Sequence, residues 1–403
     1  MSRLPLEGYR VTDFGWVWAG TVLGSIFADM GAEVIKVESV HRLDGLRLGK
    51  VFELGEALEV NPNFHNLNHS KMSITLDLRS PEGPRFAKEL IKVSDIVVEN
   101  FTPRFMPEVG LTYEELKKVK PDLVMISLPP AGSSGPLSDL LAYAPILSAL
   151  SGLDSMVGYP GERVLGIKHA YTDPTASLIG AYAVLAALRH RNATGEGQHI
   201  ELPQWEASIS LVGEAVMDYS MNKRVAGTTG NLHPMMAPHN CYRSEGDDQW
   251  ISIAIKTDDE WQAFCNAIGN PAWTREERFA DRYQRQKNVK ELDKLVTEWT
   301  SQHSKEEAAD ILQAAGVAAA PVLDTEGLFF SEHFKERGDY VDIDHPVGGN
   351  EVIYATPFRL SETPGHVWRS SPLLGQDNDY IFGEVETFVY NEIAKYKEEK
   401  IIH

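Results

Sequence analysis

The chain has 403 residues, of which 43% are hydrophobic, and this length and content predict two domains with a core in each. Its formal net charge of −20 argues against nucleic acid or an anionic membrane surface as a partner, because both would repel it. The two cysteines form no CxxC motif and no His/Cys spacing suggests a zinc site, so we expect no metal. The amino end lacks an apolar signal core and no apolar run reaches about 18 residues, which favours a soluble, cytoplasmic protein.

The first half of the chain alternates predicted strands and helices. Residues 9–38 predict a strand, a glycine-containing turn, a helix and a second strand from Glu33 to Val37. Further strands are predicted at 73–78, 95–101 and 122–128, with helices between them. This alternation is typical of an α/β fold, in which helices cover a mostly parallel, Rossmann-like sheet. Ligands of such sheets bind at the carboxyl ends of the strands, so we expect them at the loops after Phe14, Val37, Leu78, Val98 and Leu128.

The turn after the first strand, Gly15 to Gly24, matches no nucleotide-binding motif. It lacks both GxGxxG and the GK[ST] of a phosphate loop, which argues against a nicotinamide or ATP site. Basic side chains nevertheless follow the strands, and the guanidinium group suits phosphates. These arginines are Arg42, Arg47, Arg79 and Arg104. For any one of them, a solvated surface position is the alternative interpretation.

A long apolar helix is predicted to begin at Pro174 and to end near Arg191, and Asp173 precedes it. The proline suits the first helical position and pushes Asp173 toward extended geometry. An aspartate there is typical of a helix cap that accepts the amide protons of the first turn. A catalytic carboxylate is the alternative, and these residues by themselves leave both interpretations open.

The second half of the chain has a different texture. Residues 228–325 contain a loop rich in Gly, Pro, His and Met, a strand at 249–255, and amphipathic helices around 258–268 and 305–315. We therefore predict a large domain over 1–221 and a smaller α+β domain over 222–325. The Pro- and Gly-rich segment 326–403 is predicted to return to the large domain or to lie on a partner subunit.

Six segments occur in an order that is specific to one enzyme family. They are LPLEGYRVTDFGWVWAGTVLGSIFADMGAEVIKVES, NHSKMSITLDLRSPEG, DIVVENFTP, GLTYEELKKVKPDLVMISL, ATGEGQHIEL and PLLGQ. Together they resemble the family III CoA-transferases, which include formyl-CoA, carnitine and benzylsuccinate CoA-transferases. The resemblance implies CoA and acyl-CoA as substrates, no tightly bound cofactor, and an interlocked dimer, either a homodimer or a heteromer with a paralogous subunit.

The resemblance also implies roles for particular residues. Asp173 matches the family's covalent nucleophile, which passes through a mixed anhydride to an aspartyl-CoA thioester. Gln204 and Tyr143 match positions that line the reacting centre, and residues 230–238 correspond to the family's active-site loop. A basic residue of some members falls on Glu108 here, and Arg104 is its expected replacement. The positions that match CoA-contacting sites are Val17, Trp18, Ala19, Leu76, Arg79, Asn100 and Phe101.

Departures from the family pattern bear on the substrate. Leu141 replaces a lysine of formyl-CoA transferase, and PPAG at 129–132 replaces the usual Ser-Gly-Phe-Gly, which argues against oxalate or formate. We expect CoA to move from a donor such as succinyl-CoA to a bulkier, benzylsuccinate-like acid, because Trp16, Trp18, Met235 and Met236 are predicted near the pocket. Two alternatives are an acyl-CoA racemase, disfavoured because Tyr143 stands where a racemase has its catalytic histidine, and a catalytically silent subunit of a transferase complex.

Overall fold

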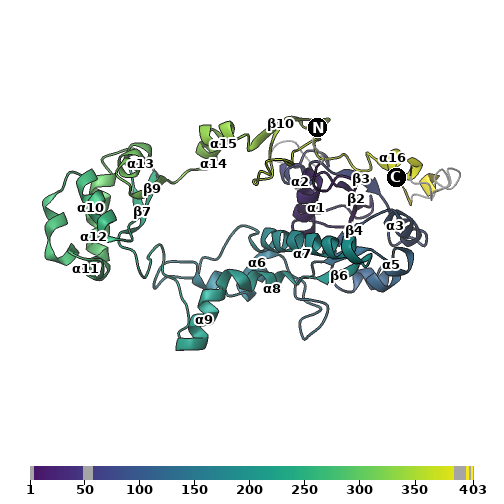
Figure 1. Ribbon diagram of the computed structural model, residues 1–403, viewed down its shortest axis with the longest axis horizontal. Helices are drawn as coiled ribbons and strands as arrows, with labels where there is room; N and C mark the ends of the chain where they lie inside the picture. Colours follow the sequence, from purple (N-terminus) through teal and green to yellow (C-terminus); the bar gives the residue numbers. More distant parts are fainter. Residues whose placement is uncertain (1–3, 49–57, 385–395, 399–400, 403) are drawn as a thin grey trace. The chain divides into compact units, whose positions relative to one another are not determined.

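The computed structural model describes residues 4–48, 58–384, 396–398 and 401–402 (Figure 1). The chain divides into two compact units. The larger comprises Met1–Asp154, Gly166–Val225 and His333–His403, and the smaller comprises Ser155–Leu165 and Ala226–Glu332. The smaller unit overlaps the domain predicted at 222–325 and also takes in residues 155–165, for which the sequence offered no indication.

A six-stranded sheet forms the centre of the larger unit. Its order is β3-β2-β1-β4-β5-β6 and every neighbouring pair is parallel. This is the doubly wound order. Successive strands are added on one side of β1 up to β3 and on its other side from β4 onward, so the topological switch point lies between β1 and β4. The strands are β1 (Arg10–Asp13), β2 (Glu33–Glu38), β3 (Met72–Thr75), β4 (Ile96–Glu99), β5 (Val124–Ser127) and β6 (Gln198–Glu201). The Rossmann-like prediction is confirmed, but β6 was not predicted because this exposed edge strand, QHIE, contains one apolar residue.

Helices cover both faces of this sheet. The helices of the larger unit up to Val225 are α1 (Ala19–Asp29), α2 (Pro62–Asn68), α3 (Gly83–Lys92), α4 (Phe105–Glu108), α5 (Tyr113–Val119), α6 (Ala144–Leu150), α7 (Thr172–Thr194), α8 (Gln204–Ile209) and α9 (Gly213–Asn222). Leu23 of α1 and Val184 of α7 share one buried cluster with Val98 and Ile126. Val97, between two residues of that cluster, faces the opposite side, as the two-residue period of a strand requires.

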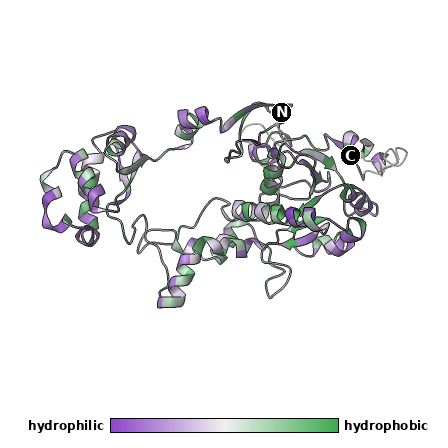
Figure 2. Ribbon diagram, viewed as in Figure 1, coloured by the Kyte–Doolittle hydropathy of each residue, from purple (hydrophilic) through white to green (hydrophobic). Residues whose placement is uncertain are grey.

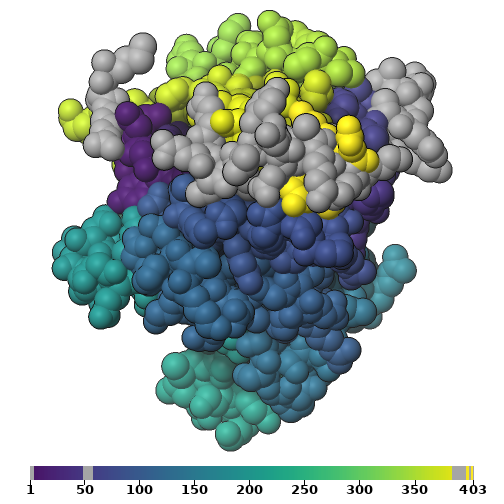
Figure 3. Space-filling view, turned by 90° about the vertical axis from the view of Figure 1, so that its right-hand side faces the viewer, coloured from purple at the N-terminus to yellow at the C-terminus, as the bar shows by residue number. Residues whose placement is uncertain are grey.

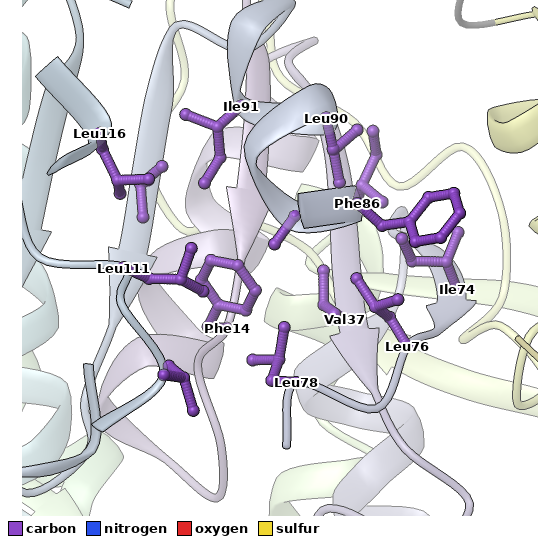
Figure 4. Close-up of a cluster of buried hydrophobic side chains, with 14 of the residues drawn as sticks. Phe14, Val37, Ile74, Leu76, Leu78, Phe86, Leu90, Ile91, Leu111 and Leu116 are labelled. Carbon is purple, nitrogen blue, oxygen red and sulfur yellow. The ribbon is translucent and has the colours of Figure 1, made fainter. Parts of the chain in front are cut away.

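The opposite face carries the second core cluster of the larger unit (Figure 4). Phe86 and Leu90 of α3 point toward Val37, Ile74 and other strand residues, and all are almost fully buried (Figure 4). Aromatic residues from the end of the chain complete this cluster, since Phe86 contacts Phe382 and Tyr396 edge to face. The core is therefore built from both ends of the sequence.

The segment after the smaller unit contains α15 (Glu332–Arg337), the antiparallel hairpin of β10 (Tyr340–His345) and β11 (Gly349–Tyr354), and α16 (Asn378–Glu384). It covers the edge of the sheet at β3. The amide of Ser73 donates to Asp377 at 2.8 Å and the amide of Thr75 donates to Asn378 at 2.9 Å. In Figure 3 this yellow part of the chain lies against the purple and blue amino-terminal part. These contacts protect an edge that would otherwise expose unpaired strand amides.

The smaller unit has its own sheet and core. The antiparallel sheet has the order β7 (His239–Arg243), β8 (Trp250–Ala254) and β9 (Ala318–Pro321). Its helices are α10 (Asp258–Ala267), α11 (Arg282–Lys287), α12 (Val289–Thr300), α13 (Lys305–Ala314) and α14 (Thr325–Phe329). They carry hydrophobic and hydrophilic residues in alternation (Figure 2), so that one side of each main helix packs into the core. Thr257 and Glu260 form a capping box that starts α10.

The long helix α7 differs from its prediction in two ways. It begins at Thr172, so Asp173 lies inside the first turn and Tyr171 occupies the cap position. Pro174 is tolerated within the first turn of the helix because the amides of that turn have no helical partner in any case. The helix was expected to be buried, yet Tyr182 is 77% exposed and Leu178 59%. No helix among the described residues is long and apolar enough to span a bilayer.

Candidate active site

Asp173 lies where the amino-terminal ends of α7 and α1 meet. Its side chain is half-buried and accepts a hydrogen bond from the Thr172 hydroxyl at 3.2 Å. The hydroxyl of Ser177 joins the two helices, because it lies 2.7 Å from the carbonyl oxygen of Ala19 and 2.8 Å from that of Asp173. Gly180 allows α7 to pack closely on the sheet, since an added Cβ there would come within 3.1 Å of Ile126 on β5.

The environment of Asp173 raises its pKa from 3.8 to about 6. Burial is the largest cause, and hydrogen bonds from Thr172 and from the backbone amides of Asp173 and Ala19 oppose it. Burial therefore outweighs the effect of the amides on the pKa of this carboxyl group. A carboxyl with such a pKa is still about 90% ionised at pH 7. Asp173 thus combines access, negative charge and a nearby amide donor.

The turn after β1 approaches Asp173 through its last residue. Ala19 is fully buried at the start of α1, and its amide is the one that lowers the pKa of Asp173. Val17, two residues earlier, has a φ of 60°, which is rare for a β-branched residue. Asn100 clamps the turn, because it accepts from the Trp16 amide and donates to the Trp16 carbonyl, both at 2.8 Å.

A hollow lies beside this turn, at the carboxyl ends of β2 and β3. It encloses about 430 Å³, including its open mouth. Aromatic rings form part of its wall, and Arg42 lies over Trp16 at 5.3 Å while Arg79 lies over Phe105 at 5.8 Å. The lining residues are Trp16, Val37, Glu38, Ser39, Arg42, Leu76, Asp77, Leu78, Arg79, Phe101 and Phe105. Aromatic rings with exposed guanidinium groups suit a ligand that carries both a flat ring and phosphates.

The structure brings some of the predicted residues together and separates others. Arg42, Leu76, Arg79 and Phe101 line the hollow, whereas Val17, Trp18 and Ala19 form the turn that leads from it to Asp173. Asn100 acts on the turn by its hydrogen bonds rather than from the hollow's wall.

Three other predicted residues have different surroundings. Gln204 is buried and donates to the Leu128 carbonyl at 2.7 Å. Tyr143 is 73% exposed at the start of α6. Arg104 is exposed and pairs with Asp139. The predicted active-site loop at 230–238 belongs to the smaller unit.

Arg47 does not present its guanidinium group to a phosphate in this structure. It is 1% exposed, pairs with Glu38 at 2.9 Å and with Glu59 at 2.7 Å, and donates to the Pro372 carbonyl. These partners occupy every side of the fork, so Arg47 ties the segment after β2 to the carboxyl-terminal segment. The position of Arg47 after a strand gave no indication of these contacts, because only folding brings Glu38, Glu59 and Pro372 around one guanidinium group.

One group of described residues could offer ligands to a metal ion, namely His65, His345 and Glu351. The Nδ1 of His345 accepts from the amides of Val347 and Gly348, so its proton resides on Nε2. The two imidazole rings are stacked at 4.1 Å, and stacked rings direct their lone pairs side by side rather than toward one point. His65 also bonds to Glu351. The group therefore fits a hydrogen-bonded link between α2 and the β10–β11 hairpin better than a metal centre.

Several residues of the site were missed by sequence analysis. Phe105 contributes to the wall of the hollow, and Ser177 joins α7 to α1. Asp44 accepts from the Val17 amide, with its two oxygens at 3.1 and 3.2 Å. None of these stands in a recognisable motif, because each acts through a partner that only folding brings near.

Comparison with known proteins identifies the family to which this site belongs. The model of CoA-transferase family III matches residues 6–378. The chain is 31% identical to a succinyl-CoA–D-citramalate CoA-transferase from Chloroflexus aurantiacus over 99% of this chain and 98% of the relative. It is also 31% identical to a succinyl-CoA–L-malate CoA-transferase beta subunit from Chloroflexus aurantiacus, over 100% and 99%. A crystal structure of a CAIB/BAIF family protein from Brucella suis superposes with a TM-score of 0.86 and 29% identity, covering 95% of this chain and 100% of the other. The chain therefore belongs to CoA-transferase family III.

Proposed function

We propose that this enzyme transfers CoA from succinyl-CoA to a second dicarboxylic acid, and that Asp173 carries the transferred groups. The observation that carries this proposal is the half-buried Asp173 carboxylate, mostly ionised at neutral pH and in contact with the Ala19 amide. A carboxylate is a weak nucleophile, and partial desolvation makes it more reactive while the amide keeps it in place.

The proposed reaction proceeds in four balanced steps. A carboxylate oxygen of Asp173 attacks the thioester carbonyl of succinyl-CoA. CoA thiolate departs, and a mixed anhydride of Asp173 and succinate forms. The thiolate then attacks the Asp173 carbonyl, which releases succinate and forms an aspartyl-CoA thioester. The acceptor carboxylate attacks this thioester, which frees CoA thiolate and forms a second mixed anhydride. The thiolate then attacks the acceptor carbonyl of this anhydride, which releases the new acyl-CoA and the Asp173 carboxylate. The contact of the Ala19 amide with Asp173 supports a role for this amide in stabilising the oxyanions on Asp173.

The hollow beside the turn is the proposed site for the nucleotide end of CoA. Its aromatic rings suit adenine, and Arg42 and Arg79 suit the phosphates. The buried indole N–H of Trp16 has no hydrogen-bond partner among the described residues, which favours a ligand with an acceptor atom at that place. The turn joins the two places, because Trp16 lines the hollow and Ala19 lies at Asp173.

The proposed acceptor is a dicarboxylic acid. The two relatives named above act on citramalate and malate, and both names give succinyl-CoA as the donor. The half-buried Trp16 and Trp18 provide apolar surface near the turn, which supports a bulkier acid such as benzylsuccinate. An acceptor screen with succinyl-CoA as donor compares benzylsuccinate, citramalate, malate and glutarate directly.

The proposed assembly is an interlocked homodimer or a heteromer with a paralogous subunit. Exposed apolar residues on α7 and α9 support a partner chain, since α9 has no buried residue and its Met221 is 72% exposed. The name of the malate relative, a beta subunit, supports the heteromer.

The test is to trap the acylated carboxylate. The enzyme is incubated with succinyl-CoA, hydroxylamine is added, and the modified peptide is found by mass spectrometry. We expect a hydroxamate on Asp173 and none in Asp173→Asn. Asp379→Asn is the matched control, because Asp379 also lies in the first turn of a helix but is exposed. Turnover without modification of Asp173 contradicts the mechanism, and deuterium exchange at the α-carbon without an acceptor acid indicates a racemase instead.

A further inference from the structure

A fully buried ion pair lies beneath the turn between β1 and α1. Lys36, in the middle of the sheet on β2, contacts Asp44 at 2.8 Å, and neither side chain is exposed. Burial opposes both charges, but their mutual attraction prevails, so the pKa of Lys36 is raised and that of Asp44 is lowered. Both groups are therefore charged in the folded protein, at a place where a charge needs a specific partner.

Both members of this pair bind the backbone of the turn. The ammonium group of Lys36 donates to the Gly15 carbonyl at 2.7 Å. The Asp44 carboxylate accepts from the Val17 amide at 3.1 Å and from the Leu46 amide at 2.9 Å. The pair thus holds the Gly15 carbonyl at the beginning of the turn and the Val17 amide in its middle. Asn100 holds Trp16, the residue between them.

The turn needs such restraint because its conformation is unfavourable for its sequence. Val17 has a φ of 60°, and a β-branched side chain strongly disfavours that region. Without an acceptor for its amide, Val17 would relax toward a negative φ, and the chain direction after it would change. Ala19, two residues later, would move with it.

We propose that Asp44 is a positioning residue for the nucleophile: it holds Val17 in the left-handed conformation that directs the Ala19 amide at Asp173. The inference rests on the proposed function of Asp173. Ser177 contacts the Ala19 carbonyl from the other side, so Ala19 is held both by α7 and by the turn that Asp44 restrains. Because the Ala19 amide lowers the pKa of Asp173, loosening the turn raises that pKa and reduces the reactive fraction at neutral pH.

The experiment measures how fast succinyl-CoA and hydroxylamine modify Asp173, as a function of pH, in wild type and Asp44→Asn. Asn weakens the contact with the Val17 amide, because a neutral amide oxygen is a poorer acceptor than a carboxylate. We expect labelling at pH 7 to slow by about tenfold and the pH midpoint of labelling to move upward. A variant that folds and labels with the wild-type rate and midpoint overturns the proposal.

A suppressor variant separates positioning from a general structural role. Glycine adopts a φ of 60° without steric conflict, so Val17→Gly lowers the need for Asp44. We expect Asp44→Asn with Val17→Gly to recover most of the labelling rate and the wild-type midpoint. If Asp44 only supports the fold, the added glycine leaves both defects in place, and that result contradicts the proposal.

Loss of Asp44 leaves Lys36 without its partner, so the single variant has a risk of misfolding. Val17→Pro leaves Lys36 and Asp44 in place. It tests the same geometry, because proline fixes φ near about −65° and has no amide proton for Asp44 to accept. We expect the same upward shift of the midpoint, and a wild-type midpoint in this variant overturns the proposal. Failure of the proposed function is distinguishable, since it shows as unlabelled Asp173 in the wild-type enzyme itself.

Discussion

Asp173 and Glu99 both lie near the carboxyl ends of the strands, and both have a raised pKa, but their surroundings differ. Burial raises the pKa of Asp173 to about 6 and that of Glu99, at the end of β4, to about 7. Glu99 is 5% exposed, and its carboxyl group is bonded to the Phe101 amide and to Ser127. Asp173 is half-buried between two helix ends.

The comparison shows that a raised pKa does not by itself identify a nucleophile. Ser127 bonds to Glu99 and also to His199 at 2.9 Å, and the Phe101 amide donates to Glu99. Hydrogen bonds therefore engage the Glu99 carboxyl group, which would have to be free to attack a thioester. About half of Glu99 is protonated at pH 7, whereas Asp173 is mostly charged. Access, charge and contact with an amide at a helix end together make Asp173 the candidate, and Glu99 serves as its natural control.

The largest expected effect is the loss of catalysis when the nucleophile is removed. We expect Asp173→Asn to reduce kcat by more than about a thousandfold, because an amide cannot form the anhydride. Glu99→Gln should stay within about threefold of wild type, since it changes no atom that reacts. Steady-state assays with succinyl-CoA measure both variants, and circular dichroism checks their folding. Equal losses in the two variants would remove the distinction between the sites.

The second effect concerns stability and pH. Between its unfolded pKa of 4.5 and its folded pKa of about 7, Glu99 binds more protons in the folded state, so stability falls as pH rises through this range. The difference in pKa corresponds to about 3 kcal/mol. Urea unfolding from pH 4.5 to 8 should show this decline in wild type and a flatter profile in Glu99→Gln. Identical slopes would mean that Glu99 is not protonated in the folded protein.

The third effect concerns binding at the hollow. Arg42→Ala and Arg79→Ala should each raise the KM for succinyl-CoA by about tenfold, which is about 1.4 kcal/mol, with little change in kcat. Arg278→Ala is the matched control, because Arg278 also lies over an aromatic ring, Phe279, but is not among the residues that line the hollow. A reduced kcat with an unchanged KM would indicate that the hollow does not hold CoA.

The smallest effect is expected at the contact between α7 and α1. Ser177→Ala removes the hydroxyl that joins the two helices and should lower stability by about 1 kcal/mol, with a decrease of about twofold in kcat. Thr175→Ala is its control, since that hydroxyl donates to the carbonyl of Tyr171, the residue that caps α7. Equal effects of the two variants on kcat would show that the contact does not support the site.

The alternation of strands and helices in the first half of the chain was sufficient to predict a parallel, doubly wound sheet. Strands such as IVVE and VMIS are buried along their whole length, so helices must cover both faces of the sheet that they form. Asp173, Arg42, Leu76, Arg79 and Phe101 were singled out from sequence, and the structure places them at or near one edge of the sheet. β6 was missed because an exposed edge strand has little hydrophobic pattern.

Only the tertiary structure decided which charged residues face a ligand and which support the fold. Arg42 and Arg47 stand five positions apart after the same strand, yet Arg42 is exposed over Trp16 and Arg47 is buried between Glu38 and Glu59. The pKa of Asp173 and the contact of Asp44 with Val17 also depend on segments that are distant in sequence. Desolvation and pairing are set by the three-dimensional neighbours of a group, whereas the sequence specifies only the group itself and the local conformation it favours.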